Sequence, residues 1–204
     1  MFSRRIDHLS LLYLYNRTQV IIDEMKNPDH PWLTRDAVKL LDALLKPIDI
    51  GVEFGSGRST VWFAKRLKSL TSIENNELWY RKVSSSLKEQ KLDGHVDYRL
   101  IKDLDSYALQ GNSFADNSID FCLVDGVMRG ECAHSMLSKV RSGGLLVVDN
   151  VNWYLPNEKA FSPDSMPPGQ FASDLWKEFE MQTRSWRRVW TSNGVNDTCI
   201  FIRP

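Results

Sequence analysis

Residues 52–60, Val-Glu-Phe-Gly-Ser-Gly-Arg-Ser-Thr, are the stretch that decides the fold of this chain. The apolar run at 50–54 predicts a short buried strand, and residues 61–64 continue a helix that begins just after the glycines. Gly55 and Gly57 allow a sharp turn and let the backbone approach a ligand closely. The free N–H groups at the start of the helix favour a ligand with negative or polar atoms. The segment therefore predicts a strand, a ligand-binding turn and a helix.

Strands and helices alternate along the chain after this turn. Further strands are predicted at residues 69–74, 96–101, 119–124 and 145–148, with helices around Trp79 to Leu87 and near Cys132 to Val140. Such alternation with short links indicates a parallel sheet that helices cover on both faces. Residues 187–191 and 199–202 predict two more strands, joined by a turn with the hairpin signal Asn193-Gly194. We therefore predict an α/β fold with a mostly parallel seven-stranded sheet that ends in an antiparallel β-hairpin.

The bulk composition limits the classes of function. With 204 residues the chain is long enough for one domain, and its 26 Lys and Arg balance 26 Asp and Glu. This balance gives no attraction to nucleic acid or to an anionic membrane, and no apolar run approaches the ~20 residues of a membrane span. The three cysteines, Cys122, Cys132 and Cys199, show no paired spacing, and the N-terminus shows no cleavage site. We expect a cytoplasmic protein without disulfides.

Two helices are predicted before the first strand. One spans residues 6–25 and ends at Asn27-Pro28. The second has Thr34 as its N-cap and runs to Leu45, where Pro47 stops it. We therefore divide the chain into a helical extension, residues 1–46, and a ligand-binding α/β domain, residues 47–204.

Glu74 stands at the end of the second predicted strand, 74 − 57 = 17 residues after Gly57. A carboxylate at that strand end can accept hydrogen bonds from both hydroxyls of a ribose. The alternative is an exposed glutamate at the start of a helix, which the following residues 75–77, Asn-Asn-Glu, also allow. A dinucleotide fingerprint would place a third glycine at position 60, where this chain has threonine. The glycine turn and Glu74 together favour a ligand that contains a ribose.

Four short segments resemble class I S-adenosylmethionine-dependent methyltransferases: residues 53–60, Ser72-Ile73-Glu74, Trp79-Tyr80 and Val124-Asp125-Gly126. The similarity covers roughly Pro31 to Pro204 in order and spacing. It implies a Rossmann-like domain with S-adenosylmethionine as cofactor, Glu74 on the ribose, and Asp103 or Leu104 near the adenine. A merely solvated loop is the alternative for Asp103. The implied cofactor-binding residues are Glu53, Gly55, Ser56, Gly57, Ser59, Thr60, Glu74, Asp103, Leu104 and Asp125.

Polar residues also follow the fourth and fifth predicted strands. Asp125 follows the fourth strand, and Asp149 and Asn150 follow the fifth. Ligands of an open α/β sheet bind outside the carboxyl ends of its strands, so we expect these side chains to face one crevice. Three oxygen ligands suit a hard divalent cation. Asp and Asn also favour the turn after a strand, so both explanations stay open.

The segment 143–150, followed by Trp153, resembles the cation-dependent catechol and caffeoyl-coenzyme A O-methyltransferases. The resemblance implies that Asp125, Asp149 and Asn150 hold Mg²⁺ or Mn²⁺, which would orient the acceptor hydroxyl and lower its pKa. Many metal-independent methyltransferases also carry an acid after the fifth strand. Metal use is therefore one of two options.

The residue that would act as the base departs from these families. They place a lysine three residues after the first aspartate, but this chain has Met128 there and Arg129 beside it. Arginine stays protonated and is a poor base, so Arg129 is predicted to bind an anionic group of the acceptor. His134 is the predicted substitute base, with a surface or capping histidine as the alternative. The predicted catalytic residues are Asp125, Arg129 and His134.

Two segments are candidates to enclose the acceptor pocket. Residues 152–170 hold four of the eight prolines of the chain and predict either a lid or a surface excursion. The extension, with Tyr13, Tyr15 and the segment 29–32, is predicted to cover the pocket or to form a homodimer face.

The function that the sequence favours is methyl transfer to a small-molecule or carbohydrate-like hydroxyl acceptor, with a divalent cation as one option. The alternatives are a metal-independent N- or O-methyltransferase, a nicotinamide-dependent oxidoreductase and a non-catalytic cofactor-binding module. The missing third glycine and the terminal hairpin disfavour the oxidoreductase. Residues 125–128, Asp-Gly-Val-Met, lack the Asn/Asp-Pro-Pro-aromatic sequence of base and glutamine N-methyltransferases. With the neutral charge, this disfavours a nucleic-acid acceptor.

Overall fold

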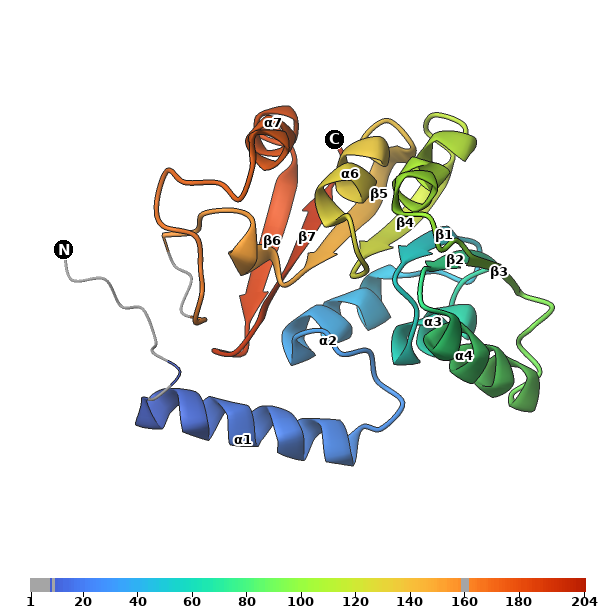
Figure 1. Cartoon of the computed structure of the whole chain (residues 1–204), viewed down its shortest axis with the longest axis horizontal. Helices are drawn as coiled ribbons and strands as arrows, with labels where there is room; N and C mark the ends of the chain where they lie inside the picture. The colour runs from blue at the N-terminus through green and yellow to red at the C-terminus, as the bar shows by residue number, and fades with distance from the viewer. Residues whose placement is uncertain (1–7, 9, 159–161) are drawn as a thin grey trace.

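One sheet forms the centre of the molecule (Figure 1). The computed structural model describes residue 8, residues 10–158 and residues 162–204. Within them the sheet has seven strands in the order β3-β2-β1-β4-β5-β7-β6; β1 to β5 pair in parallel, and β7 runs antiparallel to β5 and β6. The strands are β1 (Ile50–Phe54), β2 (Ser69–Glu74), β3 (Val96–Leu100), β4 (Ile119–Val124), β5 (Val140–Asp149), β6 (Arg187–Ser192) and β7 (Asp197–Ile202). This confirms the predicted Rossmann-like sheet with its terminal hairpin.

Helices cover both faces of the sheet. Buried residues of α2, α3 and α4 pack on one face, and those of α5, α6 and α7 pack on the other, as Figure 1 shows for the labelled helices. Two short 3₁₀ helices, η1 (Leu109–Ser113) and η2 (Val151–Trp153), follow α5 and β5. The α-helices are α1 (Leu11–Lys26), α2 (Arg35–Leu44), α3 (Arg58–Ala64), α4 (Glu77–Glu89), α5 (Leu104–Ala108), α6 (Arg129–Ser135) and α7 (Asp174–Gln182).

Helix α6 and strand β5 differ from their predicted bounds. The helix predicted near residues 132–140 begins earlier, at Arg129, and ends at Ser135. Val140 already belongs to β5, where it pairs with Ile119. Only the buried half of β5 was predicted, because residues 141–143 are exposed and carry no apolar signal. The left-handed backbone of Gly143 (φ +75°) lies within this first half.

Helix α2 is firmly attached to the sheet. The predicted N-cap is confirmed, since the Thr34 hydroxyl accepts a hydrogen bond from the N–H of Ala37 at 3.4 Å. The Thr34 hydroxyl also contacts that of Thr191, and its backbone N–H donates to Thr198 Oγ1 at 3.2 Å. Leu41 is fully buried in the core of this face. Hydrogen bonds and apolar packing therefore join α2 to the terminal hairpin.

Helix α1 lies apart from the sheet (Figure 1), and none of its residues is buried. Its described residues include most of the helix predicted at 6–25, although residues 6, 7 and 9 lie outside the described part of the chain. Asp23 forms an ion pair with Arg35 of α2 at 3.7 Å. Near its N-terminal end, Asn16 lies so close to the β6–β7 turn that a Cβ atom on Gly194 would be 2.0 Å from Asn16 Nδ2. In the part of the chain that the structure describes, none of the helices combines the length and apolarity needed to cross a membrane.

Candidate active site

The glycine turn joins β1 to α3 and packs against the end of β4. Gly55 has a φ of +91°, and a Cβ atom there would lie 2.5 Å from the backbone nitrogen of Gly126. Glycine is therefore required at position 55 both for the backbone conformation and for the close approach. The N–H of Gly57 donates to Thr60 Oγ1 at 2.9 Å, which closes the turn onto the first residues of α3.

Glu53 lies buried beneath this turn. Its Oε2 atom accepts hydrogen bonds from Thr60 Oγ1 at 2.6 Å and from Ser72 Oγ at 2.7 Å. Its Oε1 atom has no hydrogen-bond partner among the described residues. Burial raises the pKa of Glu53 to about 7, and hydrogen bonds from Ser59, Thr60 and Ser72 oppose this rise.

Glu74 at the end of β2 faces the glycine turn. Its Oε2 atom accepts hydrogen bonds from the backbone N–H of Ser56 at 3.0 Å and from the Ser56 hydroxyl at 2.7 Å. Its Oε1 atom accepts from the backbone N–H groups of Asn75 at 2.9 Å and Asn76 at 2.8 Å. The Ser56 hydroxyl also contacts the Tyr98 hydroxyl at 2.7 Å. The carboxylate therefore already binds a hydroxyl that the turn itself supplies.

Two tryptophans connect this turn to the segment between α1 and α2. The indole N–H of Trp79 on α4 donates to the carbonyl oxygen of Ser56. The Trp79 ring stacks on Trp32 with 6.2 Å between centroids, and the Arg58 guanidinium lies 4.9 Å from the Trp32 ring centre. The sequence places Trp79 near the motif, but it does not reveal this stack, because Trp32 is 47 positions away (79 − 32) and meets it only in the folded chain.

Asp103 caps a helix. Its side chain accepts a hydrogen bond from the N–H of Ser106 at 2.8 Å at the start of α5, and this bond lowers the pKa of the exposed carboxyl. Leu104, the other candidate for contact with an adenine, is partly exposed at the start of the same helix.

Asp125, Asp149 and Asn150 meet at the carboxyl edge of the sheet, as their positions after β4 and at the end of β5 predict. Asp149 is buried and accepts a hydrogen bond at 2.6 Å from the hydroxyl of Thr198 on β7. Burial raises the pKa of both aspartates above the ordinary value. The neighbouring Asp125 charge raises that of Asp149 further, and Arg129 lowers both. Sequence reasoning missed Thr198, which comes 49 residues after Asp149.

Arg129 forms hydrogen bonds with all three of these residues. It is the first residue of α6, and its side chain is only 12% exposed. Its guanidinium forms an ion pair with Asp125, with Nη2 2.9 Å from Oδ1. Nη1 donates to the side-chain oxygen of Asn150 at 3.0 Å and to the carbonyl oxygen of Asp149. Nη2 also donates to the carbonyl oxygen of Asp125 at 2.8 Å. Nε donates to the carbonyl oxygen of Gly126 at 2.9 Å.

This arrangement does not fit a divalent cation at the predicted ligands. The oxygen atoms that would bind the metal, on Asp125 and Asn150, already accept N–H groups from Arg129, a cation. Over the described ranges, no group of three or more His, Cys, Asp or Glu side chains is arranged to hold a metal ion.

His134 lies elsewhere in the molecule. It is on α6, where its Nε2 atom is 3.2 Å from Gln182 Nε2 and 3.5 Å from Glu178 Oε1 on α7. It lines a second, open hollow with Lys139 and Arg203. Helix α6 leads away from the carboxyl edge, so the structure does not bring His134 together with Asp125 and Arg129.

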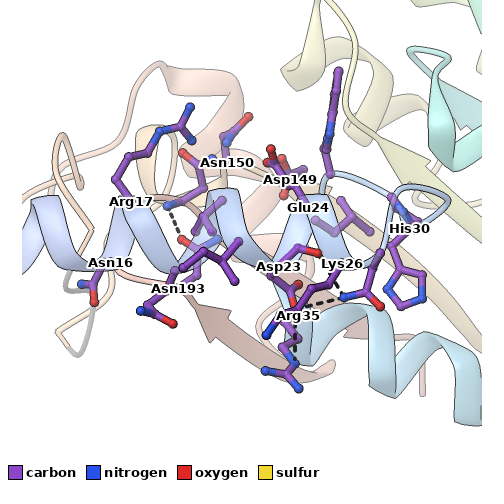
Figure 2. Close-up of a pocket in the computed structure, with 18 of the residues that line it drawn as sticks. Asn16, Arg17, Asp23, Glu24, Lys26, His30, Arg35, Asp149, Asn150 and Asn193 are labelled. Atoms are coloured by element: carbon purple, nitrogen blue, oxygen red, sulfur yellow. Dashed lines mark hydrogen bonds and ion pairs between the residues drawn. The ribbon is translucent and has the colours of Figure 1, made fainter.

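A cavity of about 790 Å³ lies over the carboxyl ends of β4 and β5, and Figure 2 shows α1 running across it. Asp125, Asp149 and Asn150 line it from the sheet, together with Asn193 and Asn196 of the β6–β7 turn. The rest of the lining comes from α1 and the segment up to Arg35: Asn16, Arg17, Gln19, Val20, Ile22, Asp23, Glu24, Lys26, Asn27, His30, Pro31, Trp32, Leu33 and Arg35. The lining does not include Tyr13 or Tyr15, which were also expected here.

Within the proline-rich segment 152–170, the residues that the structure describes do not line this cavity. They fold back on the hairpin. The buried Asn152 donates to the carbonyl oxygen of Pro163 at 3.1 Å and accepts from the N–H of Asp197 at 3.2 Å, and the Ser162 hydroxyl donates to the Asp197 carboxylate. These bonds favour the surface excursion over the lid.

Comparison with known proteins agrees with this geometry. A family model described as a methyltransferase domain matches residues 52–151. Among curated protein sequences, none matches the chain at a significant level.

Solved structures share the fold at low sequence identity. A candidate caffeoyl-CoA O-methyltransferase from Staphylococcus aureus is 15% identical with a TM-score of 0.57, over 95% of this chain and 97% of that chain. An rRNA methylase from Streptococcus thermophilus is 17% identical with a TM-score of 0.54, over 83% and 97% of the two chains. A candidate methyltransferase from Streptococcus mutans, solved in complex with SAH, is 12% identical with a TM-score of 0.53, over 80% and 93%. With the family match and the glycine turn at the sheet edge, the chain is a class I S-adenosylmethionine-dependent methyltransferase.

Proposed function

We propose that this enzyme methylates a hydroxyl group of a small, polyhydroxylated acceptor that binds in the cavity beneath α1. The observation that carries the proposal is the composition of that cavity. Six of its lining residues have amide side chains, which both donate and accept hydrogen bonds: Asn16, Gln19, Asn27, Asn150, Asn193 and Asn196. Carbohydrate-like hydroxyls need partners of this kind.

The charges of the lining support the same acceptor class. The cationic Arg17, Lys26 and Arg35 are offset by the four acidic residues of the lining: Asp23, Glu24, Asp125 and Asp149. A balanced wall does not select a strongly anionic ligand. A flat aromatic acceptor would instead require mainly apolar walls.

The cofactor contacts that we propose lie on the neighbouring side of the sheet edge. Gly55 to Thr60 would surround the methionine part of S-adenosylmethionine, with Glu53 beneath them and Asp125 beside them. Glu74 would accept hydrogen bonds from the ribose, replacing the bond that the Ser56 hydroxyl now makes. Leu104 would contact the adenine, while Asp103 holds the start of α5.

Asp149 is the residue that we propose as proton acceptor. It lines the cavity, and the Thr198 hydroxyl holds its Oδ1 atom. During transfer, the acceptor oxygen forms a bond to the methyl carbon, the bond from that carbon to sulfur breaks, and the hydroxyl proton moves to the Asp149 carboxylate. The fold contributes by holding the oxygen in line with the methyl group.

Helix α1 is the part of the extension 1–46 that we propose as cover of the acceptor, since it forms one wall of the cavity. The alternative, a homodimer face, stays a prediction.

Cofactor binding is the first test. Isothermal titration should show that S-adenosylhomocysteine binds to the wild type. The affinity of Glu74→Gln should be lower by about tenfold or more, because hydrogen bonds to a charged group are worth about 1.5–3 kcal/mol. Glu77→Gln is the matched control, since Glu77 lies at the surface and pairs with Arg81 and Lys102. Equal affinity of all three proteins would remove Glu74 from the ribose site.

The acceptor is tested with a methyl-labelled cofactor. Sugars and glycosides should accept label, whereas catechols and hydroxycinnamoyl esters should not. Asp149→Asn should lose transfer and keep S-adenosylhomocysteine binding. Label on catechols alone, or full transfer by Asp149→Asn, would contradict the proposal.

A further inference from the structure

The geometry points to Arg129 as a built-in cation that occupies the place of the divalent metal at the acceptor site. The inference rests on the proposed function and deepens it. It assigns Arg129 to hold Asp125 and Asn150 in position, and it predicts that the enzyme transfers methyl groups without a metal. It also removes one requirement on the acceptor, that of two adjacent hydroxyls.

The hydrogen bonds of Arg129 account for its whole guanidinium group. A guanidinium has five N–H groups, one on Nε and two on each Nη. Nε donates to Gly126, Nη1 donates to Asp149 and Asn150, and Nη2 donates twice to Asp125. All five N–H groups therefore have acceptors within the protein. No N–H group is left for an anionic acceptor, which was the role predicted for Arg129.

Electrostatics favour a permanent cation at this point. Asp125 lies close enough for its charge to raise the pKa of Asp149, and burial raises the pKa of both. Arginine stays protonated at every physiological pH and binds carboxylates through a planar fork. Arg129 thus supplies the positive charge that a bound metal would otherwise supply to these carboxylates.

The start of α6 aims the side chain. Met128 adopts a left-handed backbone conformation (φ 49°) immediately before the helix. Arg129 is then the first helical residue, four positions after Asp125, and the turn between them lets its guanidinium reach back to that carboxylate. Nη1 of the guanidinium is fixed by its bonds to Asp149 and Asn150, which come 20 and 21 residues later in the sequence.

The acceptor class follows from this placement. A divalent cation can bind two adjacent oxygens of an acceptor, as a chelate. Arg129 has no open position of that kind, so the acceptor hydroxyl must be held by the cavity wall and by Asp149. We therefore infer that a single hydroxyl is sufficient and that a vicinal diol is not required.

The test is a titration of the full-length chain with Mn²⁺ after all metals have been removed. Electron paramagnetic resonance measures how much Mn²⁺ is bound. The wild type should show no saturable site up to about 1 mM Mn²⁺, the weak end of protein cation sites. Arg129→Ala should gain one such site, because it frees Asp125 Oδ1, the side-chain oxygen of Asn150 and the carbonyl oxygen of Asp149 beside the Asp149 carboxylate. Arg129→Ala/Asp149→Asn should lose it again. Arg129→Lys is the matched control: it keeps a positive charge and should gain no site.

Two results would overturn the assignment. One is a stoichiometric Mn²⁺ site in the wild type that Asp149→Asn removes. The other is a folded Arg129→Ala, shown by circular dichroism, that gains no Mn²⁺ site. If Arg129→Ala does not fold, the wild type alone tests the assignment. Its affinity for S-adenosylhomocysteine and its thermal midpoint should be the same with a chelator and with Mn²⁺, and a change in either would contradict the assignment. Because Mn²⁺ titration needs neither cofactor nor acceptor, failure of the methyl-transfer proposal would appear separately, as absent S-adenosylhomocysteine binding.

Discussion

Glu53 lies beneath the glycine turn with no exposed surface, and among the described residues only its Oε2 atom, not Oε1, has hydrogen-bond partners. Burial makes its ionised form costly, so its pKa rises from 4.5 to about 7 in the folded chain. The unfolded chain has the ordinary value. Between these two values the folded state therefore binds more protons than the unfolded state.

The first prediction concerns stability against pH. As pH rises from 4.5 to about 7, the wild type should lose about 3 kcal/mol of unfolding free energy through Glu53, because this group must ionise where it is fully buried from water. Glu53→Gln should remove that loss and be the more stable protein at pH 8. Urea unfolding of the cofactor-free protein measures both. Glu77→Gln, at an exposed site, should keep the wild-type slope; equal slopes in wild type and Glu53→Gln would contradict the assigned pKa.

The second prediction concerns Ser56. Its hydroxyl donates to Glu74 at 2.7 Å, where we propose that a ribose hydroxyl binds. Ser56→Ala should therefore bind S-adenosylhomocysteine about threefold more tightly, since one competing hydrogen bond of about 0.5–1.5 kcal/mol is removed. Titration calorimetry measures the change. Tyr98→Phe, which removes the other partner of the Ser56 hydroxyl, should not tighten binding. Weaker binding by Ser56→Ala would show that this hydroxyl contacts the cofactor.

Among the elements, α1 makes two contacts with the rest of the fold that bear on its position. Asn16 contacts the β6–β7 turn at Gly194, and Asp23 pairs with Arg35. No residue of the helix is buried, so its position over the cavity depends on a few contacts.

The third prediction uses two glycines with nearly the same backbone. Gly194 (φ +74°) and Gly169 (φ +76°) would both strain an alanine, but only at Gly194 would the new Cβ meet Asn16, at 2.0 Å. Each substitution should cost about 1 kcal/mol of stability. Only Gly194→Ala should also increase hydrogen exchange in α1, because that contact holds the helix. Equal exchange in both variants would show that the turn does not hold α1.

At the scale of the whole molecule, the two helices of the extension differ in how they are attached. Helix α2 buries Ala37, Val38 and Leu41 in the core, whereas α1 buries nothing. The division of the chain at residue 46 stays a prediction, and this packing favours a boundary before α2.

The fourth prediction compares the two helices. Deleting residues 1–26 should leave the thermal midpoint within about 2 °C and S-adenosylhomocysteine binding intact, because little apolar surface is lost. Methyl transfer should be lost with the wall of the cavity. Leu41→Ala in α2 should instead cost about 2–5 kcal/mol, the range for a buried leucine. Scanning calorimetry measures both. A large destabilisation by the deletion would show that α1 belongs to the cooperative core.

Much of the fold could be predicted because its signals are local. The bounds of β1, β2 and β4 follow from apolar runs between turn residues, and Thr34 marks the start of α2 through its own hydroxyl. The exposed half of β5 escaped prediction, since residues 141–143 lack an apolar pattern and join the strand only through pairing.

The candidate site likewise has a part that could be predicted from local sequence and a part that could not. By itself the sequence determined that Asp125, Asp149 and Asn150 stand at strand ends, and parallel strands bring such ends to one edge. It could not show that Arg129 neutralises that edge, because two of its partners are 20 and 21 residues away. His134 was the predicted substitute base, with a surface histidine as the alternative, and α6 carries it toward Glu178 and Gln182 of α7. Only the tertiary structure decided these contacts and the position of α1 over the cavity, because they depend on how separate elements pack and not on the pattern within any one of them.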